Sequence, residues 1–278
     1  MKQLIPSLLL GSLLSLSFTS SYSQEVKPTV LQESEKTMHS QWSGKKVVFL
    51  GDSMTDKDRV GTTCIYWEYL SKLMNFTPLV YGFNGSEWNG IYAQAQKLLS
   101  DKKNVDAILI FAGTNDYNDN IPLGKFFNFT QQKVNHNGMV ILRKHREPIM
   151  SDTTFCGRVN KVLSFLKTNF PTKQVILLTP IHRAYAWFGN NNVQPDENYC
   201  NGRNLFIDSY INVLKKASSY WSVPLIDLYS LSGLYPLYDS NMVYFHDAKN
   251  DRLHPNASGD YRIAKTLQYQ LLALPASF

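Results

Sequence analysis

Ser53 lies in a short motif whose residue types could support nucleophilic chemistry. It follows an apolar run, residues 47–50, that stops abruptly at Gly51 and Asp52. Four consecutive apolar residues favour a strand covered on both faces, and parallel sheets bind ligands just beyond the carboxyl ends of such strands. The motif therefore puts a serine hydroxyl where a substrate could reach it. In the alternative interpretation, the hydroxyl only caps the following helix.

A histidine is the partner that such a serine would need. A serine hydroxyl is a poor nucleophile until an imidazole takes its proton, and a carboxylate can then stabilise the charged imidazole. The chain has six histidines, of which His182, His246 and His254 lie near the expected site. Asp251 precedes His254 by three residues, a spacing at which a single turn could present both side chains on one face.

Two further polar turns follow apolar runs that are typical of buried strands. The turn Asn84-Gly85-Ser86 comes shortly after residues 78–81, and the turn at residues 113–116 comes directly after residues 105–112. Because the carboxyl ends of parallel strands meet at one edge of a sheet, we expect these turns to lie close to Ser53.

Helices alternate with strands along the chain. Residues 174–180 and 223–228 are also expected to be strands. Apolar residues recur at helical spacing in five segments: residues 64–74, 91–99, 159–170, 205–220 and 257–272. This alternation predicts a parallel sheet with helices on both faces. Two connections, residues 117–154 and 181–204, are longer than such units need, and we expect them to form the walls of the site.

Four motifs in this order resemble those of the SGNH hydrolases, the GDSL-type esterases and lipases, of an exported bacterial type. They are Gly51-Asp52-Ser53, Asn84-Gly85-Ser86, the Gly-Thr-Asn-Asp of residues 113–116 and the Asp-Arg-Leu-His-Pro of residues 251–255. The resemblance spans about residues 46–270 and leaves the two long connections uncovered. It implies an α/β fold, a three-layer α/β/α sandwich with a parallel five-stranded sheet in the flavodoxin-like order 2-1-3-4-5.

The resemblance also implies which residues are catalytic. Ser53 would be the nucleophile. Through the family's D-x-x-H motif, His254 would be its base and Asp251 would orient His254. No cofactor is implied.

An oxyanion hole is implied as well. Its donors would be the backbone amides of Ser53 and Gly85 and the side-chain amide of Asn115. Donors that are already in place stabilise the charge that develops on the substrate oxygen. Gly82 is a nearby competitor of Gly85 for this role.

Other acidic residues near the motifs are expected to be structural. Asp52 and Asp116 should hold their loops by hydrogen bonds from their carboxylates to backbone groups. Asp56 and Asp58 lie close to Asp52 in sequence, but a hard metal ion normally needs about six oxygen ligands or more, so no metal is expected.

Aromatic residues in the loops after strand ends could stack on sugar rings of a substrate. Five lie there: Trp88, Tyr117, Tyr185, Trp187 and Phe188. We take Trp88, Tyr117 and Trp187 as candidate substrate-binding residues, with core packing as the alternative for each.

The charge and the cysteines give little support to several other function classes. Lys and Arg number 28 against 22 Asp and Glu, a net charge of +6 without any long basic block, so no nucleic acid partner is expected. Cys64, Cys156 and Cys200 are widely spaced, which argues against a zinc site and against a disulfide scaffold. One disulfide with one buried thiol remains an option, and the pairing stays open.

The N-terminal residues have the order of a secretory signal peptide. Met1 and Lys2 precede an apolar stretch at residues 4–18, and small polar residues follow. We expect residues 1–23 to be a signal peptide, residues 24–44 a polar N-terminal lead-in and residues 45–278 the hydrolase domain. The mature protein would be periplasmic or extracellular without a stable membrane span, because no later stretch has about 18 uninterrupted apolar residues. An uncleaved anchor is the alternative.

The expected function is that of a serine esterase acting on a small-molecule or glycan ester. It would hydrolyse short acyl groups, in particular acetyl groups on a carbohydrate, by a Ser-His-Asp mechanism. One alternative is a lipase or thioesterase for longer acyl chains, but the polar segment 118–147 does not suggest the continuous apolar groove that this needs. The other is a non-catalytic carbohydrate-binding relative, against which the intact motifs argue.

Overall fold

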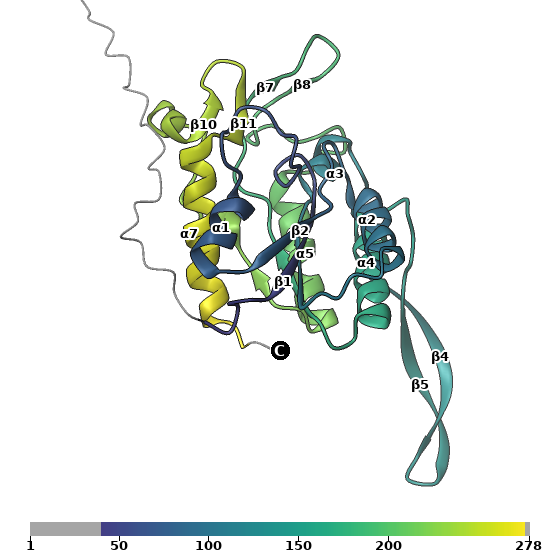
Figure 1. The fold of residues 1–278 in the computed structure, drawn as a ribbon. Coiled ribbons are helices and arrows are strands. Elements are labelled where there is room, and N and C mark those ends of the chain that lie inside the picture. Colours follow the sequence, from purple (N-terminus) through teal and green to yellow (C-terminus); the bar gives the residue numbers. More distant parts are fainter. Residues whose placement is uncertain (1–39, 276–278) are drawn as a thin grey trace, which may run out of the picture.

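A sheet of five parallel strands forms the centre of the molecule (Figure 1). The structure, a computed structural model, describes residues 40–275. The strand order is β2-β1-β3-β6-β9, and every neighbouring pair is parallel. The bounds are β1 (Lys46–Gly51), β2 (Thr77–Val80), β3 (Ala107–Phe111), β6 (Gln174–Leu178) and β9 (Leu225–Ile226). The predicted α/β fold and the flavodoxin-like order are therefore confirmed.

Helices cover both faces of this sheet. One face packs against α2 (Trp88–Ser100), α4 (Phe155–Asn169) and α5 (Ile207–Trp221), and the other against α1 (Tyr66–Met74) and α7 (Ala257–Ala273). Strand β1 shows why both faces must be apolar. Its residues Val48 and Leu50 belong to the first apolar core, and Val47 and Phe49 to the second, because successive side chains of a strand face opposite sides.

The remaining helical segments are short. They are α3 (Thr114–Asn118), α6 (Leu228–Leu231) and the 3-10 helix η1 (Asp239–Tyr244). Helix α3 begins directly after the turn at the end of β3, so it carries the motif of residues 113–116 to the carboxyl edge of the sheet.

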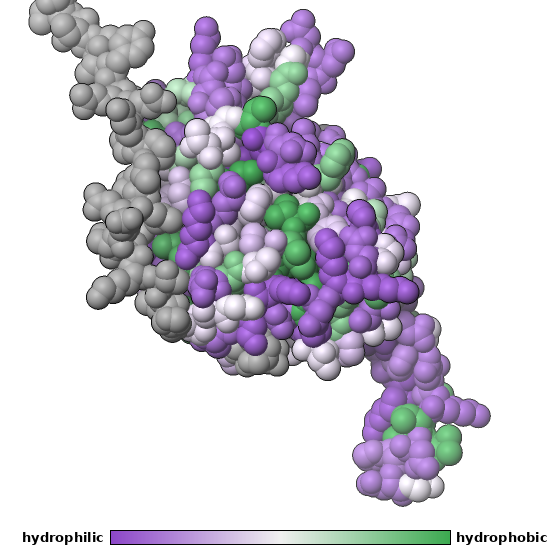
Figure 2. All heavy atoms as spheres, in the orientation of Figure 1, coloured by the Kyte–Doolittle hydropathy of each residue, from purple (hydrophilic) through white to green (hydrophobic). Residues whose placement is uncertain are grey.

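Most of the first long connection does not line the site, so the expectation was wrong for that part, although Tyr117, Asn118 and Asn120 at its start border a neighbouring cleft. It contains β4 (Phe127–His136) and β5 (Met139–Pro148), an antiparallel hairpin that projects from the body and is called the arm here (Figure 1). Within the described residues, its strands pair only with each other. Its far end carries exposed apolar side chains among hydrophilic ones (Figure 2), including Met139, Val140 and Leu142.

The second long connection does reach the site, through a small antiparallel sheet. It contributes β7 (Ala186–Trp187) and β8 (Val193–Gln194), which join β10 (Phe245–Asp247) and β11 (Asp251–Pro255) in the order β10-β11-β7-β8. Strand β11 carries the C-terminal motif. The connection and the motif are therefore held together as one unit.

The folded domain begins before the predicted boundary at residue 45. Trp42 is fully buried in the second apolar core, and its indole N–H donates to the Leu271 carbonyl at 3.1 Å. The predicted signal peptide and most of the lead-in fall within residues 1–39, which lie outside the described residues. No helix in the described part of the chain is long and apolar enough to cross a membrane.

The three cysteines are separate free thiols. Cys156 is buried, Cys64 is half-buried and Cys200 is exposed. Burial raises the pKa of the Cys64 and Cys156 thiols to about 11, which keeps both protonated at neutral pH.

Candidate active site

The end of strand β1 is held by a side chain from helix α2. Gln94 Oε1 accepts the backbone N–H of Gly51 at 2.9 Å, and Gln94 Nε2 donates to the Gly51 carbonyl at 2.8 Å. A Cβ atom at Gly51 would lie 2.2 Å from Thr55 Oγ1, so a larger residue would not fit in this tight turn. The turn delivers Ser53 to the carboxyl edge of the sheet, with 7% of its surface exposed.

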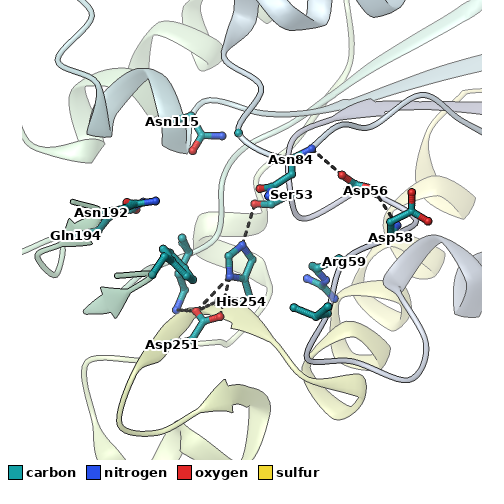
Figure 3. A pocket seen from close by; sticks show the side chains of 14 residues that line it. Ser53, Asp56, Asp58, Arg59, Asn84, Asn115, Asn192, Gln194, Asp251 and His254 are labelled. Carbon is teal, nitrogen blue, oxygen red and sulfur yellow. Dashed lines mark hydrogen bonds and ion pairs between the residues drawn. The ribbon is translucent and has the colours of Figure 1, made fainter. Parts of the chain in front are cut away.

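Ser53, His254 and Asp251 form a continuous chain of hydrogen bonds (Figure 3). His254 Nε2 lies 2.8 Å from Ser53 Oγ, and His254 Nδ1 lies 2.9 and 3.2 Å from the two carboxylate oxygens of Asp251. If Nδ1 carries the proton and donates it to the carboxylate, Nε2 is left free to accept the serine proton. The structure thus brings the three side chains named by the motifs within hydrogen-bonding distance.

The spacing of Asp251 and His254 suggested a single turn. Both residues instead lie on strand β11. Residues three apart in a strand face opposite sides, so the pairing needs a local device. Asp251 Oδ1 accepts the backbone N–H groups of Leu253 and His254 at 3.1 and 3.0 Å. These bonds turn the carboxylate along the chain toward the His254 ring, so Asp251 holds both the backbone and the ring of the histidine.

The environment of Asp251 favours its ionised form. Burial alone would raise its pKa, but the hydrogen bonds and charge of His254, together with the two backbone donors, keep the pKa below its ordinary value. An ionised carboxylate at this position can stabilise the imidazolium that forms when His254 takes a proton.

The two other histidines near the expected site have other partners. His182 Nδ1 lies 2.5 Å from Glu197 Oε1. His246 packs against Gly61, where a Cβ atom would lie 2.4 Å from the imidazole ring. Neither histidine lines the cleft around Ser53, so the geometry leaves His254 as the base that Ser53 can use.

Three hydrogen-bond donors border the cleft beside Ser53. Within residues 40–275, the backbone N–H groups of Ser53 and Gly85 have no protein acceptor. Gly85 has φ +72°, a conformation that glycine adopts without strain. Asn115 Nδ2 donates to the Ser86 carbonyl at 3.0 Å, which fixes the amide and leaves its second hydrogen for another acceptor. These are the donors that the motifs named for an oxyanion hole.

The loop that carries Gly85 is fixed by a carboxylate from the neighbouring turn. Asp56 Oδ2 accepts the backbone N–H of Asn84 at 2.7 Å, next to the Gly85 peptide. Gly82, the competitor of Gly85, does not line the cleft. Asp52 also has the expected backbone contact, because its Oδ1 accepts the N–H of Met54 at 3.0 Å.

Asp116 joins helix α3 to the start of helix α2. Its Oδ2 accepts the backbone N–H of Trp88 at 3.0 Å, and its Oδ1 lies 2.8 Å from Arg158 Nη1. The same Arg158 nitrogen lies 2.8 Å from a Glu87 carboxylate oxygen. Burial raises the pKa of Asp116, and the charge of Arg158 opposes that shift. The expected side-chain to backbone bond is present, and a buried ion pair supports it.

The cleft around Ser53 has a volume of about 360 Å³ and a mixed lining, in which polar residues outnumber apolar ones. Its apolar side chains are those of Val60, Phe188 and Leu253. The polar lining comes from ten side chains and one glycine: Ser53, Asp56, Asp58, Arg59, Asn84, Gly85, Asn115, Asn192, Gln194, Asp251 and His254. The Phe188 ring packs edge-on against the His254 ring, with centroids 5.5 Å apart. Phe188 therefore limits the movement of the imidazole.

The three candidate substrate-binding aromatics have different positions from those expected. Trp88 is fully buried and packs on Phe155 in the core, so it cannot stack on a substrate. Trp187 is 44% exposed but does not line the cleft, whereas its neighbour Phe188 does. The two side chains differ because successive side chains of an extended segment face opposite sides. Tyr117 is buried and borders a second, adjoining cleft.

A buried arginine fixes one wall of the cleft and was missed in the sequence. Arg183 Nη2 donates to Gln194 Oε1 at 2.6 Å, and its Nη1 donates to Thr114 Oγ1 at 3.1 Å. Gln194 Nε2 in turn donates to Asn192 Oδ1 at 2.9 Å. Burial lowers the pKa of the Arg183 guanidinium below its ordinary value. The only sequence signal for this group was its place in the long connection 181–204.

Metal binding has no support in the described residues. Among residues 40–275, no group of three or more His, Cys, Asp or Glu side chains could hold a metal ion. Both carboxylate oxygens of Asp56, which lines the cleft, accept backbone N–H groups, one from Asn84 and one from Asp58.

Comparisons with known proteins agree on one family and one fold. The sequence pattern of the GDSL-like Lipase/Acylhydrolase family matches residues 49–262. No curated protein sequence matches the chain at a significant level.

Solved structures share the fold over most of the chain. One is a protein from Lactobacillus plantarum, with 24% identity and a TM-score of 0.63, covering 82% of this chain and 97% of that one. A second is a possible lipase from Chitinophaga pinensis, with 20% identity, a TM-score of 0.60 and coverage of 83% and 100%. A third is a lipase/acylhydrolase from Enterococcus faecalis, with 16% identity, a TM-score of 0.51 and coverage of 82% and 96%.

Proposed function

The chain belongs to the GDSL-like lipase/acylhydrolase family and is an ester hydrolase, and on this premise we propose that it is a serine esterase for short acyl groups. Its preferred substrates are acetyl esters of a carbohydrate. The observation that carries the proposal is the chain of hydrogen bonds from Ser53 Oγ through His254 to Asp251. Three donors border it: the backbone N–H groups of Ser53 and Gly85 and the second hydrogen of the Asn115 side-chain amide.

In the acylation step, Ser53 Oγ attacks the ester carbonyl carbon while its proton passes to His254 Nε2. The carbonyl oxygen becomes an oxyanion, which accepts hydrogen bonds from the backbone amides of Ser53 and Gly85 and from Asn115 Nδ2. Asp251 stabilises the charged imidazole. When the tetrahedral intermediate collapses, the bond to the alcohol oxygen breaks and His254 returns the proton to that oxygen.

Deacylation repeats these steps with water as the nucleophile. His254 takes a proton from water, the hydroxide attacks the acyl carbon, and Ser53 leaves with the proton that His254 gives back. The products are the free alcohol and the carboxylic acid. The reaction needs no group beyond these side chains and water.

The lining of the cleft supports a short acyl group. A long acyl chain needs a continuous apolar groove, and among the residues that line the cleft only Val60, Phe188 and Leu253 have apolar side chains. The exposed amide of Asn192, whose Nδ2 makes no hydrogen bond within residues 40–275, instead suits the hydroxyl groups of a sugar, which both donate and accept hydrogen bonds. A lipase or thioesterase for longer chains is the second candidate, and the exposed Val60 is the observation that favours it most.

We also propose that the protein is exported to the periplasm or beyond the cell. The proposal rests on the charged, apolar and small-residue order of residues 1–23. Expression of the full chain followed by cell fractionation tests it, with N-terminal sequencing of the exported product. Cleavage near residue 23 is expected, and a full-length cytoplasmic product would contradict it.

The activity is tested with 4-nitrophenyl esters of increasing chain length. We expect kcat/KM to be highest for the acetate and to fall through butyrate to octanoate. Ser53→Ala should remove the activity, and Ser100→Ala, the same change at an exposed position on α2, should keep it. A preference for octanoate would favour the lipase, and no wild-type activity on any ester would favour a non-catalytic binding protein.

The carbohydrate part of the proposal needs a separate measurement. Acetate release from chemically acetylated neutral polysaccharides, followed with the wild type and with Ser53→Ala, tests it directly. Release by the wild type alone is expected. Activity on nitrophenyl acetate without any release from acetylated glycans would limit the proposal to small esters.

A further inference from the structure

A second cleft of about 320 Å³ adjoins the catalytic cleft. Asn192 lines both of them. The short helix α3 also links them, because Asn115 borders the catalytic cleft and Asn118, three residues later, borders the second. The two clefts are therefore neighbours, and a substrate that extends beyond Ser53 past Asn192 would reach the second one.

The lining of the second cleft is polar but uncharged. Among the described residues that border it, none is Asp, Glu, Lys, Arg or His. Amide side chains dominate, and they are accompanied by two tyrosines: Asn118, Asn120, Asn191, Asn192, Asn201, Tyr117 and Tyr199. Such a lining disfavours both a charged ligand, which would find no partner, and an acyl chain, which would find little apolar surface.

Three of these amides keep unused hydrogen-bonding groups. The Asn191 side chain makes no hydrogen bond within the described part of the chain. Asn192 Oδ1 accepts from Gln194, which leaves Asn192 Nδ2 free, and Asn118 Nδ2 donates to Asp119, which leaves Asn118 Oδ1 free. The cleft therefore offers both donors and acceptors to a ligand.

The base of the cleft is rigid. Tyr117 Oη donates to the Tyr199 carbonyl at 2.6 Å. Asn201 Nδ2 donates to the Tyr117 carbonyl at 2.9 Å and lies 3.0 Å from Tyr210 Oη. These bonds hold the backbone on both sides, and the Tyr199 ring, which is 64% exposed, lies at the edge of the cleft. A ligand in the cleft can stack on the exposed face of this ring.

We propose that the second cleft binds an uncharged sugar unit of the alcohol part of the ester, next to the sugar that carries the acyl group. This inference rests on the proposed function and specifies its substrate class as an acylated neutral oligo- or polysaccharide. Sugar hydroxyls pair with amides as donors and as acceptors, and the C–H face of a sugar ring packs on the face of a tyrosine. Uronic acids and phosphorylated sugars would lose the solvation of their charge without gaining a partner.

The inference is tested by comparing esters that differ only in the length of the sugar. The probes are mono-O-acetylated mono- and trisaccharides of glucose, mannose and xylose, together with 4-nitrophenyl acetate. For at least one sugar, we expect kcat/KM to be about tenfold higher for the trisaccharide than for the monosaccharide. The reason is that the trisaccharide makes additional contacts in the second cleft, and this binding energy also lowers the free energy of the transition state.

Two variants locate the effect in the second cleft. Tyr199→Ala should lower the trisaccharide-to-monosaccharide ratio of kcat/KM about fivefold, and Asn191→Ala should lower it about threefold. Tyr269→Ala removes an equally exposed tyrosine, 61% exposed on α7, and should leave the ratio unchanged. Thermal melting of each variant confirms that it is folded.

The outcomes separate this inference from the proposed function. No hydrolysis of 4-nitrophenyl acetate or of any sugar ester by the wild type would overturn the proposed function. Hydrolysis of nitrophenyl acetate with trisaccharide-to-monosaccharide ratios near one, unaffected by Tyr199→Ala, would overturn the second-cleft inference alone. A stronger preference for an acetylated uronic acid trisaccharide over the neutral ones would overturn the assignment of an uncharged ligand.

Discussion

Asp116 accepts a hydrogen bond from the backbone N–H of Trp88 at 3.0 Å, and this contact joins two of the three loops that supply the oxyanion donors. Asn115 immediately precedes Asp116, and Gly85 lies three residues before Trp88. The bond therefore fixes the distance between two groups that must act on the same oxygen. Arg158 keeps the carboxylate in place from the other side, at 2.8 Å.

Replacing Asp116 by Asn tests this positioning role. The amide has nearly the shape of the carboxylate but loses its charge, so that among residues 40–275 Arg158 keeps only Glu87 as an ionic partner. We expect kcat for nitrophenyl acetate to fall about tenfold with KM changed less than twofold, because oxyanion donors act mainly in the transition state. The free energy of unfolding should fall by about 1–3 kcal/mol.

Asp152→Asn is the matched control for Asp116→Asn. Asp152 pairs with Lys161 at the surface, where its side chain is 58% exposed. Surface ion pairs contribute about 0–1 kcal/mol, so both kinetics and stability should stay near the wild type. If Asp116→Asn raised KM and left kcat intact, its role would be in ground-state binding rather than in positioning the donors.

Ser53 and His254 should act as one unit. Ser53→Ala and His254→Ala are each expected to lower kcat by roughly 10⁴-fold or more, and the double variant should be little worse than either. Residues that share one proton-transfer step give such non-additive losses. Single-turnover and steady-state rates of all four proteins measure the coupling, and losses that multiply would show that the two residues act separately.

Phe188 and its neighbour Trp187 offer a paired test of how His254 is held. Phe188 packs edge-on against the His254 ring, whereas Trp187 does not line the cleft. An aromatic pair contributes about 0.5–1.5 kcal/mol, so Phe188→Ala should lower kcat/KM for nitrophenyl acetate about threefold to tenfold. Trp187→Ala should change it less than twofold. Equal losses in both variants would mean that the whole β7 segment, rather than the Phe188 ring, supports the histidine.

The arm should be dispensable for the chemistry. It contacts the body at its base, where Phe127 and Arg146 pack on Tyr220. Thr130 and His145 face each other across the hairpin, so residues 131–144 can be replaced by Asn-Gly, the preferred two-residue turn. The shortened protein should keep kcat/KM for nitrophenyl acetate within twofold and its Tm within about 3 °C. A large loss of activity would show that the arm reaches a catalytic group.

The sequence predicted the central sheet and the catalytic edge because both leave strong local signals. Strands β1 and β3 are buried on both faces, so their apolar runs stop where the polar turns with Ser53 and Asn115 begin. The strand order itself came from the resemblance to a known family. Strand β2, predicted at residues 78–81, lies at Thr77–Val80, within one residue of the prediction.

The arm left a signal that was not used. Asn137 and Gly138 have φ values of 52° and 79°, the left-handed conformation of a tight hairpin turn, and an Asn-Gly pair between extended segments is a strong sign of one. The short strands β7 and β8 left none, because two residues carry no periodic pattern. Their pairing depends on contacts with β11, far along the chain, and so do the positions of Trp187 and Phe188.

Asp52 gives the structure a pH dependence of stability that can be isolated. The carboxyl group is 1% exposed, accepts the backbone N–H of Met54 and forms no ion pair among the described residues. Burial raises its pKa to about 7, despite opposing charges on Arg59 and Arg183. In the unfolded chain its pKa is about 3.9.

Between about pH 4 and pH 7, the folded protein therefore holds a proton on Asp52 that the unfolded chain releases, and stability falls as the pH rises through this window. Asp52→Asn keeps the acceptor for Met54 and removes the titration. The difference in unfolding free energy, Asp52→Asn minus wild type, should be about 2–3 kcal/mol larger at pH 8 than at pH 5. Urea unfolding at both pH values measures this, with Asp239→Asn, a side chain that is 86% exposed, as the control. Parallel pH profiles for Asp52→Asn and the wild type would show that Asp52 does not change its charge between folded and unfolded states in this range.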